Sequence, residues 1–194
     1  MKFTPKINKA LKVASKAHKD QVRKGTDIPY IMHPVAVAFI VGQYGGDENA
    51  IIGGLLHDVL EDVRPEIYSA TDMEKDFGSE VVKIVRGVSE DKVAGDPNEK
   101  PWKERKEGYL AHLESSDDIR PLMISMGDKI HNLISILEDY EEKGESLWDR
   151  FNAGYTEQVW YYSEFLRIME GKPVPPEMLA KLRGLVEKLV SIGK

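Results

Sequence analysis

The sequence predicts an all-α protein, built as a helical bundle. Apolar residues recur at three- and four-residue spacing along most of the chain, whereas the alternation typical of β-strands is scarce. Prolines, a glycine pair and candidate capping residues divide these periodic stretches into helices of ordinary length. A length of 194 residues is enough for one domain with a sizeable core.

The first half of the chain divides at clear helix boundaries. Pro34 suits the first turn of a helix, where its missing N–H does no harm, and Gly45-Gly46 ends that helix. Asp47 is a candidate N-cap for the next helix, which we expect to run to about Asp62, before Pro65. The expected elements are a helix over 7–18, a polar loop over 20–29, and helices over 34–44, 47–62, 69–76 and 79–88.

The second half continues the pattern after a polar stretch rich in turn-forming residues, which we expect to be a mobile loop. The final helix is amphipathic, with leucines spaced along one face. The expected elements are a loop over 89–101, helices over 102–113, 120–140 and 148–169, a linker over 173–176 and a helix over 177–192.

Composition excludes several classes of protein. A net charge of −6 argues against a general nucleic-acid binder, and the absence of cysteine excludes disulfides, thiolate zinc sites and a cysteine nucleophile. No apolar run approaches the roughly 18 residues of a membrane span, and the N-terminus lacks the apolar segment of a signal peptide. We therefore expect a cytoplasmic protein that binds neither nucleic acid nor membrane. Trp160-Tyr161-Tyr162 and the last amphipathic helix could pack internally or form the face of a homodimer.

The run Leu55-Leu56-His57-Asp58-Val59-Leu60-Glu61-Asp62 places four ionisable side chains within an apolar helical pattern. Positions i and i+4 share a helix face, so we expect His57 to stack with Glu61, and Asp58 with Asp62. Burying these groups is costly unless something compensates their charge. A divalent cation is the simplest compensation, because imidazole and carboxylate together suit manganese, iron or zinc. Taken alone, the run is also compatible with a solvated, acidic helix end.

Three further segments accompany this run. An isolated histidine, a His-Asp pair and a distant aspartate resemble, in that order, the ligands of the HD phosphohydrolase superfamily. The resemblance is closest to the hydrolase domain of the RelA/SpoT family, and by layout to its small stand-alone alarmone hydrolases, including those of animals. It covers roughly residues 5–170 and rests on Arg23-Lys24-Gly25, Pro29-Tyr30-Ile31-Met32-His33-Pro34, the run from Leu55 to Asp62, and Asp128-Lys129-Ile130-His131-Asn132-Leu133.

This resemblance implies an HD-domain bundle over residues 1–172, with the linker and amphipathic helix of residues 173–194 packed on it. It also implies a metal site whose two imidazoles and two carboxylates leave positions open for water and substrate. The expected cofactor is a divalent metal, with Mn²⁺ preferred. The expected ligands are His33, His57, Asp58 and Asp128.

Glu61 and Asp62 follow one turn after the expected ligands. They are placed to orient or deprotonate a metal-bound water, which is the role of this pair in the resembling hydrolases. His18 and His112 belong to no motif, so we expect them to be surface or packing residues. His131 does not share the helix face of its neighbours and is expected to be structural or to support a ligand.

The resemblance also implies a small-molecule nucleotide as substrate. The arginine of the Arg-Lys pair is expected against the base and the lysine near phosphate, since a guanidinium plane can stack on a base. The expected substrate-binding residues are Arg23, Lys24, Lys92, Asn132 and Ser135; Arg105 and Lys106 are further candidates, and Arg150 and Tyr155 would complete the pocket.

The expected activity is removal of the 3′-pyrophosphate of (p)ppGpp, giving GDP or GTP plus pyrophosphate, as in the stringent response. Two alternatives remain open: a phosphatase acting on NADPH or another 2′- or 3′-phosphorylated nucleotide, and a non-catalytic nucleotide-binding protein with a structural metal. Departures from the family pattern, at Gly127, within residues 93–102 and at 148–152, surround the expected pocket and bear on the choice of nucleotide.

Overall fold

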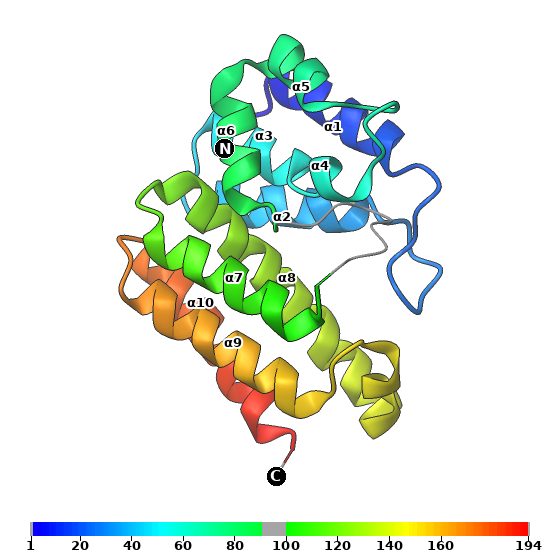
Figure 1. Cartoon of the computed structure of the whole chain (residues 1–194), viewed down its shortest axis with the longest axis vertical. Helices are drawn as coiled ribbons and strands as arrows, with labels where there is room; N and C mark the ends of the chain where they lie inside the picture. Colours follow the sequence, from blue (N-terminus) through cyan, green and yellow to red (C-terminus); the bar gives the residue numbers. More distant parts are fainter. Residues whose placement is uncertain (1, 91–99, 194) are drawn as a thin grey trace.

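The computed structural model describes residues 2–90 and 100–193, which fold into helices joined by short turns (Figure 1). An isolated antiparallel bridge between Val22 and Pro29 closes the loop that follows the first helix. The predicted all-α class is confirmed. The helices are α1 (Pro5–Ala17), α2 (Met32–Gln43), α3 (Glu48–Leu56), α4 (Val59–Asp62), α5 (Ala70–Phe77), α6 (Ser79–Val88), α7 (Trp102–Ser115), α8 (Ile119–Lys143), the 3₁₀ helix η1 (Gly144–Arg150), α9 (Tyr155–Glu170) and α10 (Pro176–Ser191).

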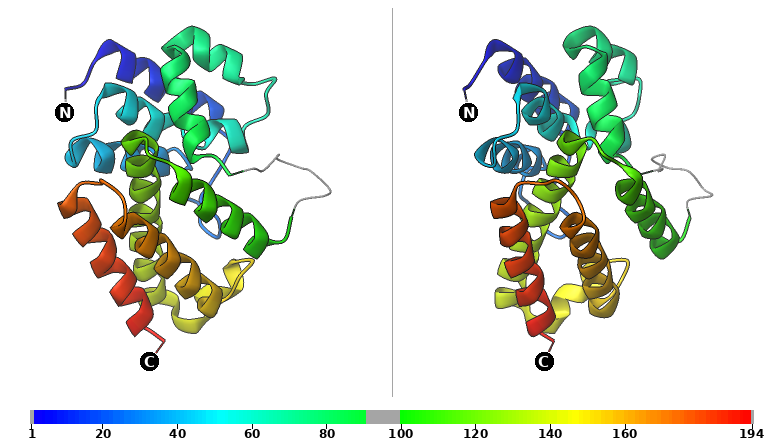
Figure 2. Two further views of the ribbon diagram at one scale, coloured as in Figure 1. Left: turned by 60° about the vertical axis from the view of Figure 1, so that its left-hand side comes forward. Right: turned by 90° about the vertical axis from the view of Figure 1, so that its left-hand side faces the viewer.

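Two hydrophobic clusters form the core. The first joins α1, α2, α3, α5 and α6, and the second joins α7, α8, α9 and α10. Helix α8 belongs to both, because Ile124 packs in the first cluster while Met123 and Met126 pack in the second. Figures 1 and 2 show the two groups of helices at opposite ends of the molecule, with α8 running between them. The middle of α8 therefore lies where the two clusters meet.

Capping side chains set several helix starts where the sequence indicates them. Thr4 accepts a hydrogen bond from the Ile7 N–H at the start of α1, and Asp47 accepts one from the Ala50 N–H at the start of α3. These contacts satisfy backbone donors that have no partner inside the helix. Among residues 2–90 and 100–193, no helix combines the length and apolar composition that crossing a membrane requires.

The predicted helix over 47–62 is wrong in one respect, because it is interrupted after Leu56. His57 and Asp58 form a turn between α3 and α4. The His57 Nδ1 atom lies 2.8 Å from the Gly54 carbonyl oxygen, the acceptor that the N–H of Asp58 would use in an unbroken helix. The imidazole therefore competes with the helix for its own backbone acceptor.

The predicted helix over 148–169 is also wrong. Gly144 ends α8 with a φ of +56°, η1 follows, and α9 begins only at Tyr155. The buried Trp148 ring lies 5.9 Å from the Tyr140 ring and 5.2 Å from the Tyr155 ring, measured between centroids. Burying this large side chain requires the chain to turn back on α8. Residues 91–99 of the predicted 89–101 loop lie outside the described part of the chain.

Helices α2 and α3 approach each other closely at Gly54. A Cβ atom added there would lie 3.1 Å from the Ala38 Cα atom and 3.3 Å from its backbone nitrogen. Such contacts are tighter than ordinary packing, and backbone atoms cannot rotate out of the way. In contrast, a Cβ atom at Gly184 in α10 would meet nothing within 4 Å.

We predict that Gly54→Ala lowers the free energy of unfolding by about 1 kcal/mol or more, because overpacking outweighs the better helix propensity of alanine. Gly184→Ala is the matched control and should raise it by up to about 1 kcal/mol. Urea denaturation followed by circular dichroism measures both. Equal stabilisation by the two substitutions would contradict the close approach of α2 and α3.

Candidate metal and nucleotide site

The four expected metal ligands come from three helical segments that meet at the middle of α8. His33 lies in the first turn of α2, His57 and Asp58 lie in the turn between α3 and α4, and Asp128 lies in α8. The His33 Nε2 atom is 3.2 Å from an Asp128 oxygen and 3.6 Å from an Asp58 oxygen. The His57 Nε2 atom is 3.1 Å from the same Asp58 oxygen. Candidate donor atoms of His33, His57 and Asp58 all lie within 4.8 Å of one another.

The orientation of His57 suits a cation. Its Nδ1 atom lies 2.8 Å from the Gly54 carbonyl, which only accepts, so this nitrogen carries the hydrogen and donates. The Nε2 lone pair is then directed at the cluster. This Nε2 atom is buried, and although it lies 3.1 Å from an Asp58 oxygen it makes no well-oriented hydrogen bond within the described residues. An unpartnered buried nitrogen among carboxylates fits a divalent metal, and we take the residues to be suited to one.

His33 is oriented by a second histidine. The Nδ1 atoms of His33 and His131 lie 2.8 Å apart, and both rings are buried. If His33 presents its Nε2 lone pair to a cation, its Nδ1–H donates to His131, which must then be neutral. Burial, together with the charges of His33 and Arg23, lowers the pKa of His131 to about 4, which favours that neutral form. The expectation that His131 supports a ligand agrees with this geometry.

The acidic groups of the cluster are held ionised. Burial by itself raises the pKa of Asp58, but His57 and His33 outweigh it and hold that pKa well below its usual range. Burial lowers the pKa of His57, but Asp58 and Asp128 raise it to about 9. The protein alone therefore attracts positive charge to this point, either as protons or as a cation.

Asp128 is fixed by its own helix. Lys129 donates to one of its oxygens at 2.5 Å, and Asn132, one turn later, donates to the other. The Lys129 ammonium is itself buried and lies 5.1 Å from the centre of the Tyr109 ring and 5.7 Å from that of Tyr161. Burial raises the pKa of Asp128, but Lys129, His33 and His57 outweigh that effect and hold the pKa well below its usual range.

Glu61 and Asp62 lie beside the cluster, at the end of α4. The Tyr30 hydroxyl donates to Asp58 at 2.7 Å and lies 3.5 Å from an Asp62 oxygen. Glu61 accepts a hydrogen bond of 2.7 Å from the backbone N–H of Glu90, at the end of α6. Sequence reasoning missed the part played by Tyr30, although its position three residues before His33 was the available signal.

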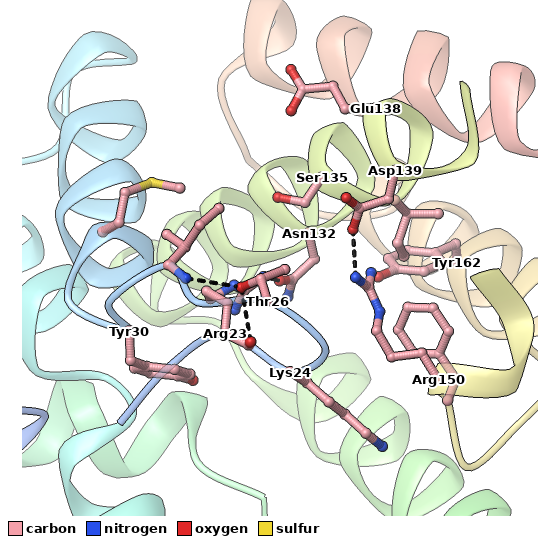
Figure 3. A pocket seen from close by; sticks show the side chains of 14 residues that line it. Arg23, Lys24, Thr26, Tyr30, Asn132, Ser135, Glu138, Asp139, Arg150 and Tyr162 are labelled. Atoms are coloured by element: carbon pink, nitrogen blue, oxygen red, sulfur yellow. Dashed lines mark hydrogen bonds and ion pairs between the residues drawn. The ribbon is translucent and has the colours of Figure 1, made fainter. Parts of the chain in front are cut away.

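The predicted substrate residues line two adjoining cavities. The first cavity, of about 320 Å³, lies over the metal cluster. The second cavity, of about 390 Å³, extends along α8. Arg23, Lys24, Tyr30 and Asn132 line both. The Arg23 guanidinium donates to the Asn132 amide oxygen at 2.8 Å, and Lys24 donates to Asn152 at 3.1 Å. Ser135 lines only the second cavity (Figure 3).

The remaining candidates have different outcomes. Arg150 lines the second cavity. Lys92 lies outside the described residues. Arg105 and Lys106 line the metal-side cavity, but both are ion-paired with Glu90. Tyr155 was placed wrongly: its hydroxyl donates toward the Leu189 and Val190 carbonyls, away from the cavities, because it packs against α10.

The structure also places residues that sequence reasoning did not select. Tyr162 lines the second cavity and Gln158 lines the first, both from α9. Asp139, three residues after Ile136 on α8, lines the second cavity and pairs with Arg150. Gln158 and Tyr162 lie four positions apart inside the predicted helix over 148–169, but nothing in the sequence indicates that this face meets the cavities. His18 is a packing residue, as expected: it is buried, and its ring centroid lies 4.9 Å from that of Tyr30.

Comparison with known proteins finds curated relatives among enzymes that are much longer than this chain. The chain is 38% identical over 134 residues to the bifunctional (p)ppGpp synthase/hydrolase SpoT of Escherichia coli K12. The aligned segment covers 66% of this chain and 18% of that protein. It is 33% identical over 139 residues to a GTP pyrophosphokinase of Myxococcus xanthus, covering 71% of this chain and 18% of that protein. The chain thus spans less than a fifth of the length of these relatives.

Solved structures agree on the fold. A Listeria monocytogenes protein superposes with a TM-score of 0.68 at 27% identity, covering 84% of this chain and 99% of that one. A metazoan ortholog of SpoT that hydrolyzes ppGpp superposes with a TM-score of 0.77 at 23% identity, covering 97% of each chain. At that identity the second likeness supports the fold alone.

The family model for the HD domain matches residues 10–154, which is more than half of the chain. This segment contains all four residues of the cluster and both flanking acids. The protein belongs to the HD domain family.

Proposed function

We propose that the protein is a divalent-metal-dependent phosphohydrolase that removes the 3′-pyrophosphate of (p)ppGpp, with GDP or GTP and pyrophosphate as products. The observation that carries this proposal is that His33, His57, Asp58 and Asp128 lie together at the base of one cavity. Two further acids and the cations Arg23 and Lys24 line the same cavity. The similarity to SpoT supports the choice of nucleotide.

The four clustered residues would hold the metal, and Mn²⁺ suits their mixture of imidazole and carboxylate. When bound, the cation would lower the pKa of a coordinated water and polarise a phosphoryl oxygen. Glu61 or Asp62 accepts the proton of the attacking water, because both carboxylates lie at the wall of the same cavity. Tyr30 keeps Asp58 and Asp62 in place through its hydroxyl group.

The substrate is held along α8. Asn132 faces both cavities and lies where a substrate oxygen next to the reacting phosphate would reach its amide. Lys24 is exposed, so it is free to follow a phosphate, while Arg23 offers a guanidinium plane to the base. The first cavity then takes the pyrophosphate and the second takes the nucleoside.

We predict that purified protein supplied with Mn²⁺ converts ppGpp to GDP and pyrophosphate, and that Asp58→Ala abolishes turnover by removing a ligand. Ion-exchange chromatography of the products measures both. Orthophosphate from another nucleotide would favour the phosphatase alternative, and ppGpp binding without product over hours would favour the non-catalytic one. Normal turnover by Asp58→Ala would contradict the metal assignment.

The orientation of His33 supplies a second prediction. His131→Ala removes the acceptor of the His33 Nδ1–H and should weaken metal binding roughly 10- to 100-fold, the range known for groups that orient metal-binding histidines. Competition with a chelating dye measures the dissociation constant. His112→Ala is the control, because His112 is exposed and bonds to the Gly87 carbonyl. An unchanged constant for His131→Ala would contradict the orienting role.

Glu61 has an unusual environment for a proton acceptor. Burial and the charges of Asp58, Glu90 and Asp62 raise its pKa from 4.5 to about 8, although the Glu90 N–H offsets part of the effect. The folded protein therefore retains a proton that the unfolded chain releases. Stability from this group is fully present below pH 4.5 and is lost as the pH rises through about 8.

We predict that chelator-treated protein loses stability between pH 5 and pH 8, by up to about 1.4 kcal/mol per pH unit from this group. Glu61→Gln cannot ionise and should lack that part of the slope. Urea denaturation at several pH values, with both proteins measured in parallel, isolates the contribution of Glu61 from those of other titrating groups. Identical slopes for the two proteins would rule out the raised pKa.

A further inference from the structure

An acid-base pair lies in the second cavity, away from the metal cluster. Asp139 of α8 and Arg150 of η1 both line this cavity, and an Asp139 oxygen lies 2.6 Å from the Arg150 Nη1 atom. Their side chains are 22% and 15% exposed, so the pair is largely shielded from water. Figure 3 shows the two side chains directed toward each other across the cavity from Arg23 and Lys24. The mechanism described above does not use this pair.

The position of the pair along α8 matches the length of a nucleotide. Asp128, Asn132, Ser135 and Asp139 follow one another at three- and four-residue spacing, which places them along one face of the helix. Eleven residues separate the first from the last, a rise of about 16 Å. A nucleotide whose 3′-phosphates lie at the metal cluster would therefore extend its base toward Asp139 and Arg150.

The pair is held rigidly. Gly25, with a φ of +74°, lets the loop that carries Arg23 lie directly against Arg150: an added Cβ atom would be 2.4 Å from the Arg150 Cδ atom. The guanidinium also lies 4.9 Å from the centre of the Phe151 ring. Within the described residues, neither the second Asp139 oxygen nor the Arg150 Nη2 atom makes a hydrogen bond or ion pair. The Arg150 Nε atom is buried and also has no hydrogen-bond partner within the described residues. The pair thus retains an accepting oxygen on Asp139 and N–H donors on Arg150.

We propose that Asp139 and Arg150 select guanine over adenine, an inference that rests on the proposed nucleotide hydrolysis. Guanine carries N–H donors at N1 and N2 beside an acceptor at O6, whereas adenine carries a donor at N6 beside an acceptor at N1. A carboxylate next to a guanidinium complements the guanine pattern and opposes the adenine pattern. A shielded, charge-assisted contact of this kind gives strong discrimination.

Recognition of guanine would explain why the Asp139 carboxylate lies in a cavity whose proposed ligand is an anion. An isolated aspartate would repel a nucleotide that carries several phosphates, so its presence needs a compensating contact. Arg150 neutralises the Asp139 charge. The pair then distinguishes bases by their hydrogen-bond donors and acceptors rather than by charge. Glu138, the neighbouring residue, also lines the cavity but is exposed and has no ion pair with a described residue. It offers a matched control that carries the same charge.

The test is binding of GDP, IDP and ADP to the wild-type protein, Asp139→Asn and Glu138→Gln, measured by isothermal titration calorimetry. None of these nucleotides has a 3′-phosphate, so none is turned over by the proposed reaction. We expect the wild type to prefer GDP over ADP, and Asp139→Asn to reduce that preference roughly tenfold to a hundredfold. IDP lacks the N2 amine, so it should bind the wild type more weakly than GDP and bind Asp139→Asn about as well as GDP. Glu138→Gln should leave all three ratios unchanged.

Two outcomes would overturn the proposal. Equal loss of GDP and ADP binding in Asp139→Asn would mean that the pair only supports the Gly25 loop. A wild type without preference between GDP and ADP would mean that the base is not read here. Failure of the proposed function looks different: the protein would prefer GDP, lose the preference in Asp139→Asn, and still release no pyrophosphate from ppGpp.

Discussion

The burial of two imidazoles and two carboxylates at one point is the constraint on which the rest of this structure depends. Ionised groups removed from water must be compensated, or folding fails. The chain supplies fixed partners from several directions: the Gly54 carbonyl for His57, the His131 ring for His33, and the Lys129 ammonium for Asp128. Each partner also sets a direction for a lone pair or a carboxylate oxygen. The contacts that make burial tolerable are therefore the ones that prepare the metal site.

Helix α8 links this constraint to substrate choice. Its two ends pack in one hydrophobic cluster and its N-terminal part contributes Ile124 to the other, so its position is fixed along most of its length. Asp128 faces the metal cluster, Asn132 faces both cavities and Asp139 faces only the second. In the proposed complex, this single helix would set the distance between the reacting phosphates of the nucleotide and its base. Sites built on helices hold such spacing better than sites built on loops.

Sequence reasoning succeeded where periodicity and spacing carry the information. Asp47 capped the expected helix, as its position indicates. The gathering of His33, the His57-Asp58 pair and Asp128 was expected from the family resemblance, and these residues lie together although they are far apart in the chain. It failed where one side chain overrides a local pattern. His57 takes the Gly54 carbonyl and interrupts an otherwise good helix, and the burial of Trp148 replaces an expected helix with a turn. Both effects depend on where one side chain points rather than on the spacing of apolar residues, so no periodicity could reveal them.

The cationic side chains around the site have different partners. We use this difference to distinguish cations that could bind a phosphate from cations that stabilise the fold. Arg105 and Lys106 are ion-paired with Glu90, so recruiting either to a phosphate would break a shielded ion pair. Arg23 and Lys24 donate instead to the neutral amides of Asn132 and Asn152.

Exchanging an amide oxygen for a phosphate oxygen gives up a neutral hydrogen bond and gains a charge-assisted one, which is roughly twice as strong. In the proposed function, this acidic protein would bind a polyphosphate through Arg23 and Lys24, because these cations rest on neutral amides rather than on carboxylates. In the sequence, Arg23 and Lys24 stood out only through their resemblance to the family motif, whereas Arg105 and Lys106 looked like a solvated helix face.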